Sequence, residues 1–274
     1  DWSSDVCSSD LLRIALIGAA GRMGLEIVRV ATAHGKAAIA AAVEHEQHPL
    51  MGHDIGLLSG VGALHVPISA DPLAAAEGCD VILDISAPSA TARIIDAAIA
   101  QKKPLVCGTT GIPDDILHRF DEAARLIPVI HTKNFSVGIA VLASLSATAA
   151  RILGKGFDVE IIEAHHRRKV DAPSGTAEIL ADAVAAGSGT PMARVYGRRG
   201  VTGERPVDEI GIHAIRGGGI FGDHTVVFAS ENERIEITHR VGSRALLAEG
   251  AVRTALFIAR ATPGRYTMNH VLGI

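Results

Sequence analysis

The stretch LLRIALIGAAGRMG, Leu11 to Gly24, decides the fold of the N-terminal half of the chain. It begins as an apolar, β-compatible run and ends in three glycines spaced G-x-x-G-x-x-G. An apolar-periodic segment that continues to about His34 predicts a helix, and the apolar run Ala37 to Val43 predicts a second buried strand that ends at Glu44. Strand, glycine turn, helix, strand and terminal acid together form the βαβ pattern typical of dinucleotide binding.

Each glycine of this turn has a physical reason to be there. Gly18 permits the tight turn, Gly21 lets the backbone approach a pyrophosphate, and Gly24 lets helix and strand pack closely. The helix N-terminus offers unpaired N–H groups and a positive dipole end to the phosphates. Glu44 is expected to accept hydrogen bonds from ribose hydroxyls. The alternatives are a plain turn and a solvated acid at a strand end.

Strands and helices continue to alternate as far as Ser136, which predicts a doubly wound parallel sheet. Ligands of such sheets bind at the carboxyl ends of the strands, so Ser86 and the loop segments GTTG and TKNFS are expected around one crevice with Glu44. Cys107 precedes GTTG, and a small buried thiol is favoured there over a nucleophile. We expect the polar segment Glu46 to Val66 to be a solvated loop without a helix or strand, and expect no metal site.

The pattern changes at Phe157. Four strands are expected at 158–164, 210–216, 222–230 and 234–240, with helices at 138–153 and 176–186 and an irregular connection at 187–208. The small residues of the first of these helices predict close helix packing. This half is therefore an α+β domain with a mixed or antiparallel sheet. An apolar helix at 245–261 is expected to return to the first domain.

The expected domain limits follow from these patterns. Residues 1–10, DWSSDVCSSD, lack any periodicity and are interpreted as a non-native or disordered leader. Residues 11–136 together with 241–274 form the dinucleotide-binding domain, and 137–240 form the second domain. The fold class is thus α/β, with an N-terminal Rossmann-like sheet and a C-terminal α+β domain.

The stretch EAHHRRKVDAPSGT, Glu163 to Thr176, concentrates more chemistry than any other. Histidine transfers protons readily near neutral pH, so His165 and His166 are candidates for acid–base chemistry. Adjacent residues of a strand point to opposite faces, so the two are expected to have different tasks. Lys169 is a candidate proton donor or electrostatic anchor. The alternatives are surface histidines and a solvated lysine.

The end of this stretch opens a helix. Backbone N–H groups at Gly175 and Thr176 can bind a carboxylate. The alternative is simple capping of the helix by Ser174. A basic, helix-capped pocket beside a nicotinamide site indicates a small acidic substrate.

Composition excludes several classes of function. The net charge of −4 argues against a nucleic-acid partner, and aromatic residues at 3% argue against base stacking. Three cysteines without framework spacing, one of them Cys79, indicate reduced thiols and a cytoplasmic setting. The longest apolar run, Val137 to Ala150, is diluted by polar residues, so no membrane partner is expected.

The motifs GAAGRMG, GTTG, NFSVG and EAHHRRKVDAPSGTA together resemble the 4-hydroxy-tetrahydrodipicolinate reductase (dihydrodipicolinate reductase) family. The resemblance covers residues 12–274, and the last motif is its most specific part. It implies a homotetramer built through the sheet of the second domain, which would then serve substrate binding and tetramerisation. It also implies reduction of a cyclic dicarboxylate imine with NADH or NADPH, in the diaminopimelate route to lysine.

The resemblance implies a role for individual positions. His165 matches the catalytic proton donor or acceptor and Lys169 a proton donor, while His166, Gly175 and Thr176 match substrate-binding residues. The matches to the nicotinamide-cofactor contacts are Gly18, Ala19, Ala20, Gly21, Arg22, Met23, Glu44, Gly108, Thr109, Thr110, Thr132, Lys133, Asn134 and Phe135. How proton transfer is divided between His165 and Lys169 stays open.

Two departures from the family pattern concern the choice of cofactor. His45 follows the ribose-binding acid, where many relatives have an arginine that reaches a 2′-phosphate. Ala87 occupies a second position where an arginine is frequent. Without either cation, we expect NADH to be used at least as well as NADPH.

Two other functions are compatible with part of the sequence. A homoserine- or sugar-type Rossmann dehydrogenase shares the first half but does not carry HHRRKVDAPSGT. A non-catalytic nicotinamide-sensing regulator needs a DNA- or partner-binding segment, for which the sequence offers no candidate.

Overall fold

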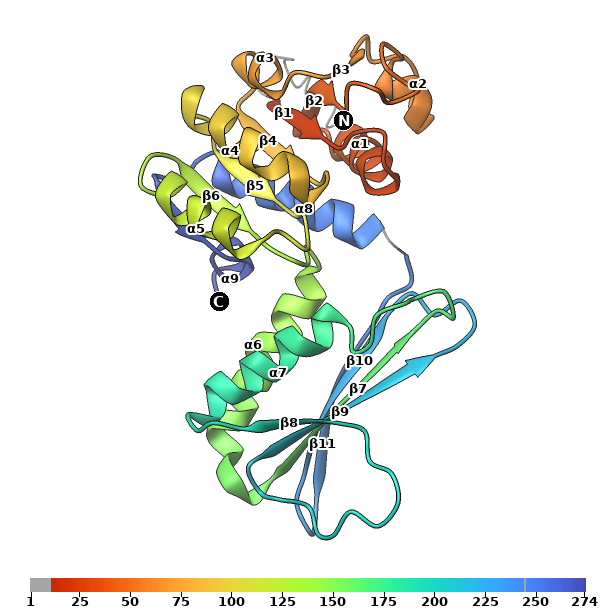
Figure 1. Cartoon of the computed structure of the whole chain (residues 1–274), viewed down its shortest axis with the longest axis vertical. Coiled ribbons are helices and arrows are strands. Elements are labelled where there is room, and N and C mark those ends of the chain that lie inside the picture. The colour runs from red at the N-terminus through yellow and green to blue at the C-terminus, as the bar shows by residue number, and fades with distance from the viewer. Residues whose placement is uncertain (1–10, 244) are drawn as a thin grey trace, which may run out of the picture. The chain divides into compact units, whose positions relative to one another are not determined.

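The structure, a computed structural model, describes residues 11–243 and 245–274; the expected leader at 1–10 lies outside the described residues. The described chain forms two compact units (Figure 1). The first comprises residues 11–135 and 245–273, and the second begins at Ser136 and continues to residue 243.

The first unit is built on a parallel seven-stranded sheet of order β12-β6-β5-β4-β1-β2-β3. The order reverses between β1 and β4, the point where ligands of doubly wound sheets bind. This confirms the predicted fold class of the N-terminal half. The strands are β1 (Leu12–Ile17), β2 (Ala37–Val43), β3 (Ile68–Ser69), β4 (Val81–Asp84), β5 (Leu105–Cys107), β6 (Pro128–His131) and β12 (Gly264–Tyr266).

Helices cover both faces of this sheet, as Figure 1 shows. Successive side chains of a strand point to opposite faces, so Ile14 and Leu16 face one helical layer while Ala15 and Ile17 face the other. All four are buried, which explains why the strands read as continuous apolar runs. One layer holds α1 (Arg22–His34) and α8 (Ala245–Ile258), and the other holds α3 (Pro72–Glu77), α4 (Thr91–Ala100) and α5 (Asp114–Ala123).

The expectation of a helix-free loop at 46–66 was wrong. Helix α2 (Ile55–Ser59) forms there because the Asp54 side chain accepts the backbone N–H of Leu57 and so caps it. The same carboxylate accepts the N–H groups of Leu64 and Val66, which ties the end of the segment to its middle. The Asp54 side chain therefore fixes the fold of this segment, and hydrophobic periodicity does not reveal hydrogen bonds of this kind.

Four other short elements also lie outside the expected ones. Strand β8 (Ala193–Tyr196) lies in the connection expected to be irregular and pairs with β9 along an edge of its sheet. Strands β3 and β12 form the two edges of the first sheet, and α9 (Met268–Leu272) follows β12. Each is held by pairing or packing with a neighbour, so its own few residues carry little pattern.

The second unit contains a five-stranded mixed sheet of order β11-β10-β7-β9-β8, which confirms the predicted mixed sheet. β10 is antiparallel to both of its neighbours, whereas β7, β9 and β8 are mutually parallel. Its longer strands are β7 (Asp158–His165), β9 (Glu209–Arg216), β10 (Asp223–Ala229) and β11 (Arg234–Arg240).

Helices α6 (Val137–Leu153) and α7 (Gly175–Ser188) cover one face of this second sheet. They pack closely, as the small residues predicted: a Cβ atom added at Gly187 would lie 2.1 Å from the carbonyl oxygen of Ala147. By length and composition alone, Val137–Gly156 could cross a membrane, a test that the core helix of a soluble protein also passes. Here Ile139 and Leu142 join the core of the second unit.

Candidate active site

The glycine turn after β1 is shaped by close approaches of the backbone. Gly18 has φ of +80°, and a Cβ atom there would lie 2.9 Å from the carbonyl oxygen of Ile85. A Cβ atom at Gly24 would lie 2.3 Å from the carbonyl oxygen of Ala19. Both positions therefore require glycine, and helix α1 begins directly after the turn, at Arg22. Its first N–H groups are available to an anion.

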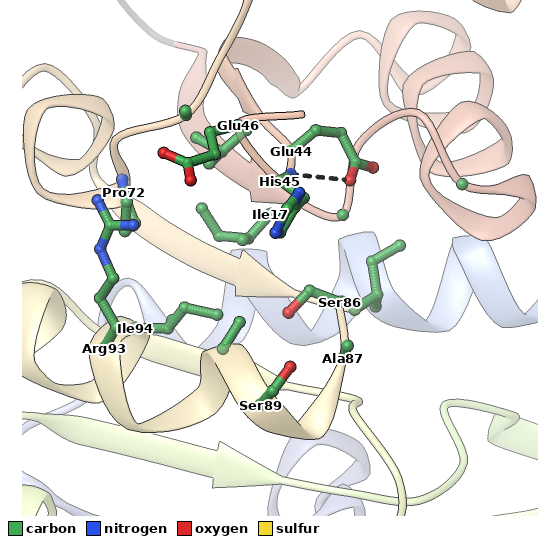
Figure 2. Close-up of a pocket in the computed structure, with 16 residues that line it drawn as sticks. Ile17, Glu44, His45, Glu46, Pro72, Ser86, Ala87, Ser89, Arg93 and Ile94 are labelled. Atoms are coloured by element: carbon green, nitrogen blue, oxygen red, sulfur yellow. Dashed lines mark hydrogen bonds between the residues drawn. The ribbon is translucent and has the colours of Figure 1, made fainter. Parts of the chain in front are cut away.

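A cavity of about 600 Å³ lies beside this turn (Figure 2). Glu44, at the end of β2, borders it, and its Oε1 accepts the backbone N–H of Ala20 at 2.9 Å. This bond fixes the carboxylate relative to the glycine turn. In Figure 2, His45 and Glu46 extend from the same strand end, whereas Arg93 approaches from α4. Other lining residues are Gly18, Gly21, Ser86, Ala87 and Ser89.

A second hollow of about 290 Å³ adjoins the first, because Ile85 and Ser86 line both. Its walls come from α1, the loop after β5 and the loop after β6. The predicted cofactor residues in its wall are Met23, Gly108, Thr109, Thr110, Lys133, Asn134 and Phe135. The four remaining predicted contacts, Ala19, Ala20, Arg22 and Thr132, line neither hollow.

A buried carboxylate that the sequence analysis did not single out holds the loops after β4 and β5. Asp84 is fully buried and accepts the backbone N–H and hydroxyl of Ser86, at 2.9 and 2.6 Å. Its other oxygen lies 3.1 Å from both Cys107 Sγ and Thr109 Oγ1. Burial and the adjacent Asp84 raise the pKa of Cys107, so it is a thiol that donates a hydrogen bond. This geometry supports the structural interpretation of Cys107 over the nucleophilic one.

The other side of the same loop is fixed by His131, at the end of β6. Its Nε2 lies 3.2 Å from the Thr109 carbonyl oxygen, and its ring stacks on Phe120 with centroids 4.9 Å apart. Burial lowers the pKa of His131, so the ring is neutral near pH 7 and donates to that carbonyl. Thr109 is thus held through both its hydroxyl and its backbone.

In the second unit, β7 ends at His165, where the EAHHRRK stretch begins to turn. The His165 ring is mostly buried, with 12% of its side chain exposed, and its Nδ1 lies 2.6 Å from Oε2 of Glu163. The loop that follows is bonded to the loop after β9: Gly217 N–H donates to the His165 carbonyl and Arg167 N–H to that of Gly218. Backbone bonds therefore fix the start of this loop.

Lys169 is turned towards an acid of its own loop. Its Nζ lies 2.8 Å from both carboxylate oxygens of Asp171, and 21% of its side chain is exposed. The hydrogen bond from Lys169 lowers the pKa of Asp171. The ammonium group is thereby held at the surface of the loop, two residues before the turn that leads to α7.

The N-terminus of α7 is held by hydrogen bonds of the Ser174 side chain. Ser174 caps it by accepting the N–H of Ala177 at 3.2 Å, and Gly175 and Thr176 are its first two residues. The Ser174 Oγ also lies 3.2 Å from Nε2 of His224, which is buried on β10. Burial, reinforced by nearby His165, lowers the pKa of His224 to about 4, so that ring is neutral near pH 7. Capping of the helix by Ser174, the alternative considered for this turn, is thus observed, and carboxylate binding at Gly175 and Thr176 stays a prediction.

Sequence reasoning singled out the ends of elements but passed over the buried polar residues beneath them. Asp84, Glu163 and His224 each lie in a buried row of a strand whose other members are apolar. A buried polar group needs a partner, so this placement is a usable signal of a functional network. The sequence around Arg93 did not indicate a functional residue, because the position of Arg93 at the cavity depends on the packing of α4.

Comparison with known proteins adds to this geometry. Two family models match the chain: "Dihydrodipicolinate reductase, N-terminus" over residues 12–135 and "Dihydrodipicolinate reductase, C-terminus" over residues 138–272. The 4-hydroxy-tetrahydrodipicolinate reductase of Alkalilimnicola ehrlichii is 45% identical over 264 residues, covering 96% of this chain and 99% of the relative. That of Geotalea uraniireducens is 42% identical over 266 residues, covering 96% and 100%.

Solved structures show the same fold. A dipicolinate-bound dihydrodipicolinate reductase from Paenisporosarcina sp. TG-14 superposes with a TM-score of 0.75 at 24% identity, covering 94% of this chain and 97% of that one. An amine dehydrogenase from Mycobacterium smegmatis gives a TM-score of 0.66 at 15% identity, with 96% of each chain covered. At these sequence identities, the solved structures are evidence for the fold alone.

Proposed function

The chain belongs to the dihydrodipicolinate reductase family, and we propose on that premise that it reduces 4-hydroxy-tetrahydrodipicolinate to tetrahydrodipicolinate with NADH or NADPH. The resemblance inferred from the sequence motifs is confirmed. The observation that carries the proposal is full-length similarity to curated enzymes of that name, at 42–45% identity. The reaction belongs to the biosynthesis of diaminopimelate and lysine.

The first unit fits a nicotinamide dinucleotide. Its glycine turn has no room for side chains at Gly18 and Gly24. The turn borders the larger cavity, and the second hollow adjoins that cavity. The start of α1 suits a pyrophosphate, and Glu44 suits ribose hydroxyls. When bound, the nicotinamide ring supplies the hydride. We assign the predicted contacts of the two hollows to cofactor binding, with Ala20 acting through its bond to Glu44.

The second unit fits a small dicarboxylate. We assign the N–H groups of Gly175 and Thr176 to one substrate carboxylate, because these residues begin α7 and the positive end of a helix dipole favours an anion. His166 and Lys169 supply positive charge or hydrogen-bond donors nearby in the sequence. These are the substrate contacts that the family resemblance implies.

Proton transfer is assigned to His165 and Lys169. The Nδ1 atom of His165 is engaged by Glu163, so its Nε2 is the atom that exchanges a proton with substrate. Lys169 is engaged by Asp171 and reaches a substrate only by leaving or sharing that partner. Both residues are therefore held by acids before substrate binds.

The charges around the larger cavity bear on the choice of cofactor. Glu44 and Glu46 line it, and neither His45 nor Ala87 supplies the arginine frequent in relatives. Among the described lining residues, Arg93 is the one arginine or lysine. Its guanidinium lies 3.6 Å from Asp71, and 67% of its side chain is exposed. We propose that NADH is used at least as well as NADPH, and that Arg93 supplies the affinity that remains for a 2′-phosphate.

We further propose a homotetramer assembled through the second unit. The face of its sheet opposite α6 and α7 carries half-exposed apolar residues, among them Ile162 at 37% and Ile215 at 50% exposure. Exposed apolar side chains gathered on one sheet face are typical of an assembly surface. A cytoplasmic location is proposed as well, because the described cysteines, Cys79 and Cys107, are free buried thiols.

Cofactor oxidation tests the function directly. The substrate is generated in situ from pyruvate and aspartate semialdehyde by the preceding synthase, and the absorbance of NADH or NADPH is followed. We expect turnover with this substrate and none when the synthase is omitted. Absence of turnover with both cofactors would refute the proposed function.

Site assignments are tested in the same assay. General acid–base catalysis contributes about a hundred- to ten-thousandfold, so His165→Ala and Lys169→Ala are each expected to lower kcat by a factor in that range. Arg168→Ala, a cation of the same loop without an assigned task, is the control. A His165→Ala/Lys169→Ala double variant with undiminished kcat would remove both residues from the mechanism.

A further inference from the structure

Glu163 is a buried carboxylate on β7 that contacts His165, and what it contributes beyond that contact has not been described so far. Its side chain is fully buried and accepts four hydrogen bonds. Arg216 donates to both of its oxygens at 2.7 Å, and the other two donors are His165 Nδ1 at 2.6 Å and the backbone N–H of Ser174 at 3.1 Å. Burying an ionised carboxylate is costly, and these donors compensate for it.

Glu163 is ionised in this setting. Burial alone would raise its pKa, but hydrogen bonds from Arg216 and His165 outweigh burial and lower it. The bond from Glu163 likewise raises the pKa of Arg216, so the pair stays charged. An ionised carboxylate only accepts hydrogen bonds. The proton in the short contact with His165 therefore resides on Nδ1 of the imidazole.

This placement of the proton defines what His165 can do. With Nδ1–H committed to Glu163, the neutral ring presents a lone pair at Nε2, and the protonated ring presents an N–H there. Gly222 lies beside that atom, and a side chain there would crowd it, because a Cβ atom at Gly222 would lie 3.1 Å from Nε2. The neutral His224 ring packs edge-on against His165 with centroids 5.2 Å apart, which limits rotation of the His165 ring.

The same carboxylate reaches the other part of the substrate site. Oε1 of Glu163 accepts the N–H of Ser174, the residue that caps α7 and directly precedes Gly175. One side chain thus connects the proposed proton-transfer residue to the proposed carboxylate-binding turn. Arg216 strengthens the connection, because its guanidinium also donates to the carbonyl oxygen of Asp171 at 2.7 Å.

We propose that Glu163 is a positioning residue that fixes the tautomer and orientation of His165 and holds it in register with the N-terminus of α7. When protonated His165 gives its Nε2 proton to the substrate, it retains the Nδ1 proton, and the neutral ring is left hydrogen-bonded to Glu163. Arg216 balances the charge of Glu163 throughout. The inference rests on the proton-transfer role proposed for His165.

Glu163→Gln tests this with little change in shape. A glutamine has one oxygen acceptor, so its amide cannot accept all four donors. Where its NH₂ group faces His165, the neutral ring must accept at Nδ1 and carry its proton on Nε2. We expect kcat to fall by roughly ten- to a hundredfold, within the range of general acid–base catalysis, with a smaller change in KM.

Glu160→Gln is the matched control. Glu160 lies on the same strand and is also held by two arginines and a histidine, namely Arg198, Arg205 and His213. It lies three residues before Glu163 and therefore points to the opposite face of β7. We expect Glu160→Gln to lower the free energy of unfolding while leaving kcat within about twofold of the wild-type value. Size-exclusion chromatography checks that the assembly state is unchanged. An equal loss of kcat in both variants would show that Glu163 is only structural.

A double-mutant cycle separates a positioning role from an independent one. If Glu163 acts through His165, then Glu163→Gln lowers kcat in the wild-type background and has no further effect in His165→Ala. Additive losses would overturn the proposal. If His165→Ala itself retains full turnover, the role assigned to His165 fails, and the contact with Glu163 is then tested by spectroscopy alone.

Ring ¹⁵N NMR of the wild-type protein needs neither turnover nor a folded Glu163 variant. The His165 signals are assigned by their loss in His165→Ala. We expect a protonated Nδ1 in wild type when the ring is neutral, and a shift towards protonated Nε2 in Glu163→Gln. A neutral wild-type ring protonated at Nε2 would contradict the inferred contact.

Discussion

At the scale of single residues, a buried acid sets the local geometry in each unit: Asp84 in the first and Glu163 in the second. Asp84 holds Ser86 and Thr109 at the cofactor cavity, and Glu163 holds His165 and Ser174 in the second unit. Each lies at or near the end of a buried strand and accepts hydrogen bonds both from a residue two positions later and from more distant segments. Removing such a donor leaves a buried acceptor unsatisfied, at a cost of about 1–3 kcal/mol.

Arg93 is the residue to which we assign a second residue-scale property, the discrimination between NADH and NADPH. We expect Arg93→Ala to lower kcat/KM for NADPH about tenfold, which corresponds to the loss of one charge-assisted hydrogen bond of about 1.4 kcal/mol. We expect the same substitution to change kcat/KM for NADH less than twofold. Arg119→Ala is the control, because Arg119 pairs with Asp96 on α4 and does not line the cavity. Equal losses with both cofactors would assign Arg93 to general binding or folding.

At the scale of elements, β7 shows how one strand serves two tasks. Its inward side chains Val159 and Ile161 lie in the core beneath α6 and α7, and Glu163 continues that row into the site. On the opposite face, Glu160 collects hydrogen bonds from Arg198, Arg205 and His213. Burial alone would raise the pKa of Glu160, but these bonds outweigh it and lower the pKa from 4.5 to about 2.

This shift predicts the acid stability of the second unit. The folded pKa of Glu160 lies below the unfolded value, so its contribution is complete above about pH 4.5 and is lost as pH falls towards 2. The shift corresponds to at most about 3 kcal/mol at neutral pH. Urea unfolding followed by circular dichroism between pH 2.5 and 7 should therefore show a weaker pH dependence in Glu160→Gln. An unchanged dependence would mean that the network contributes little to stability.

At the scale of the whole molecule, each unit has its own sheet and its own core, and the chain passes between the units twice. The helices α6 and α7 cover only one face of the second sheet. The other face keeps apolar side chains partly exposed, which is unfavourable for an isolated subunit. The proposed assembly through this face would remove that cost.

Assembly is therefore expected to depend on the uncovered face. Ile162→Lys places a charge there and should convert the proposed tetramer into smaller species, as measured by sedimentation velocity. Ile152→Lys is the matched control: Ile152 is 69% exposed but lies on α6, which covers the opposite face of the sheet. A wild-type protein that sediments as a monomer would refute the proposed assembly itself.

The sequence by itself determined the fold class of both halves and the family to which the chain belongs. Strand periodicity, the glycine turn and the helix cap at Ser174 depend on residues close together in the chain, so local sequence carries them. The family motif located His165 and Lys169 for the same reason. Short elements such as α2 and β8 escaped prediction because capping and edge pairing, not periodicity, stabilise them.

Only the tertiary structure decided how the reactive residues are held. Glu163 contacts Arg216, which is 53 residues away in the sequence, and His131 contacts Thr109, which is 22 residues away. Arg93 reaches the cofactor cavity through the packing of α4. The physical reason is common to these cases: a buried charge or polar group is tolerated only where folding brings its partner, and no single segment encodes both members of such a pair.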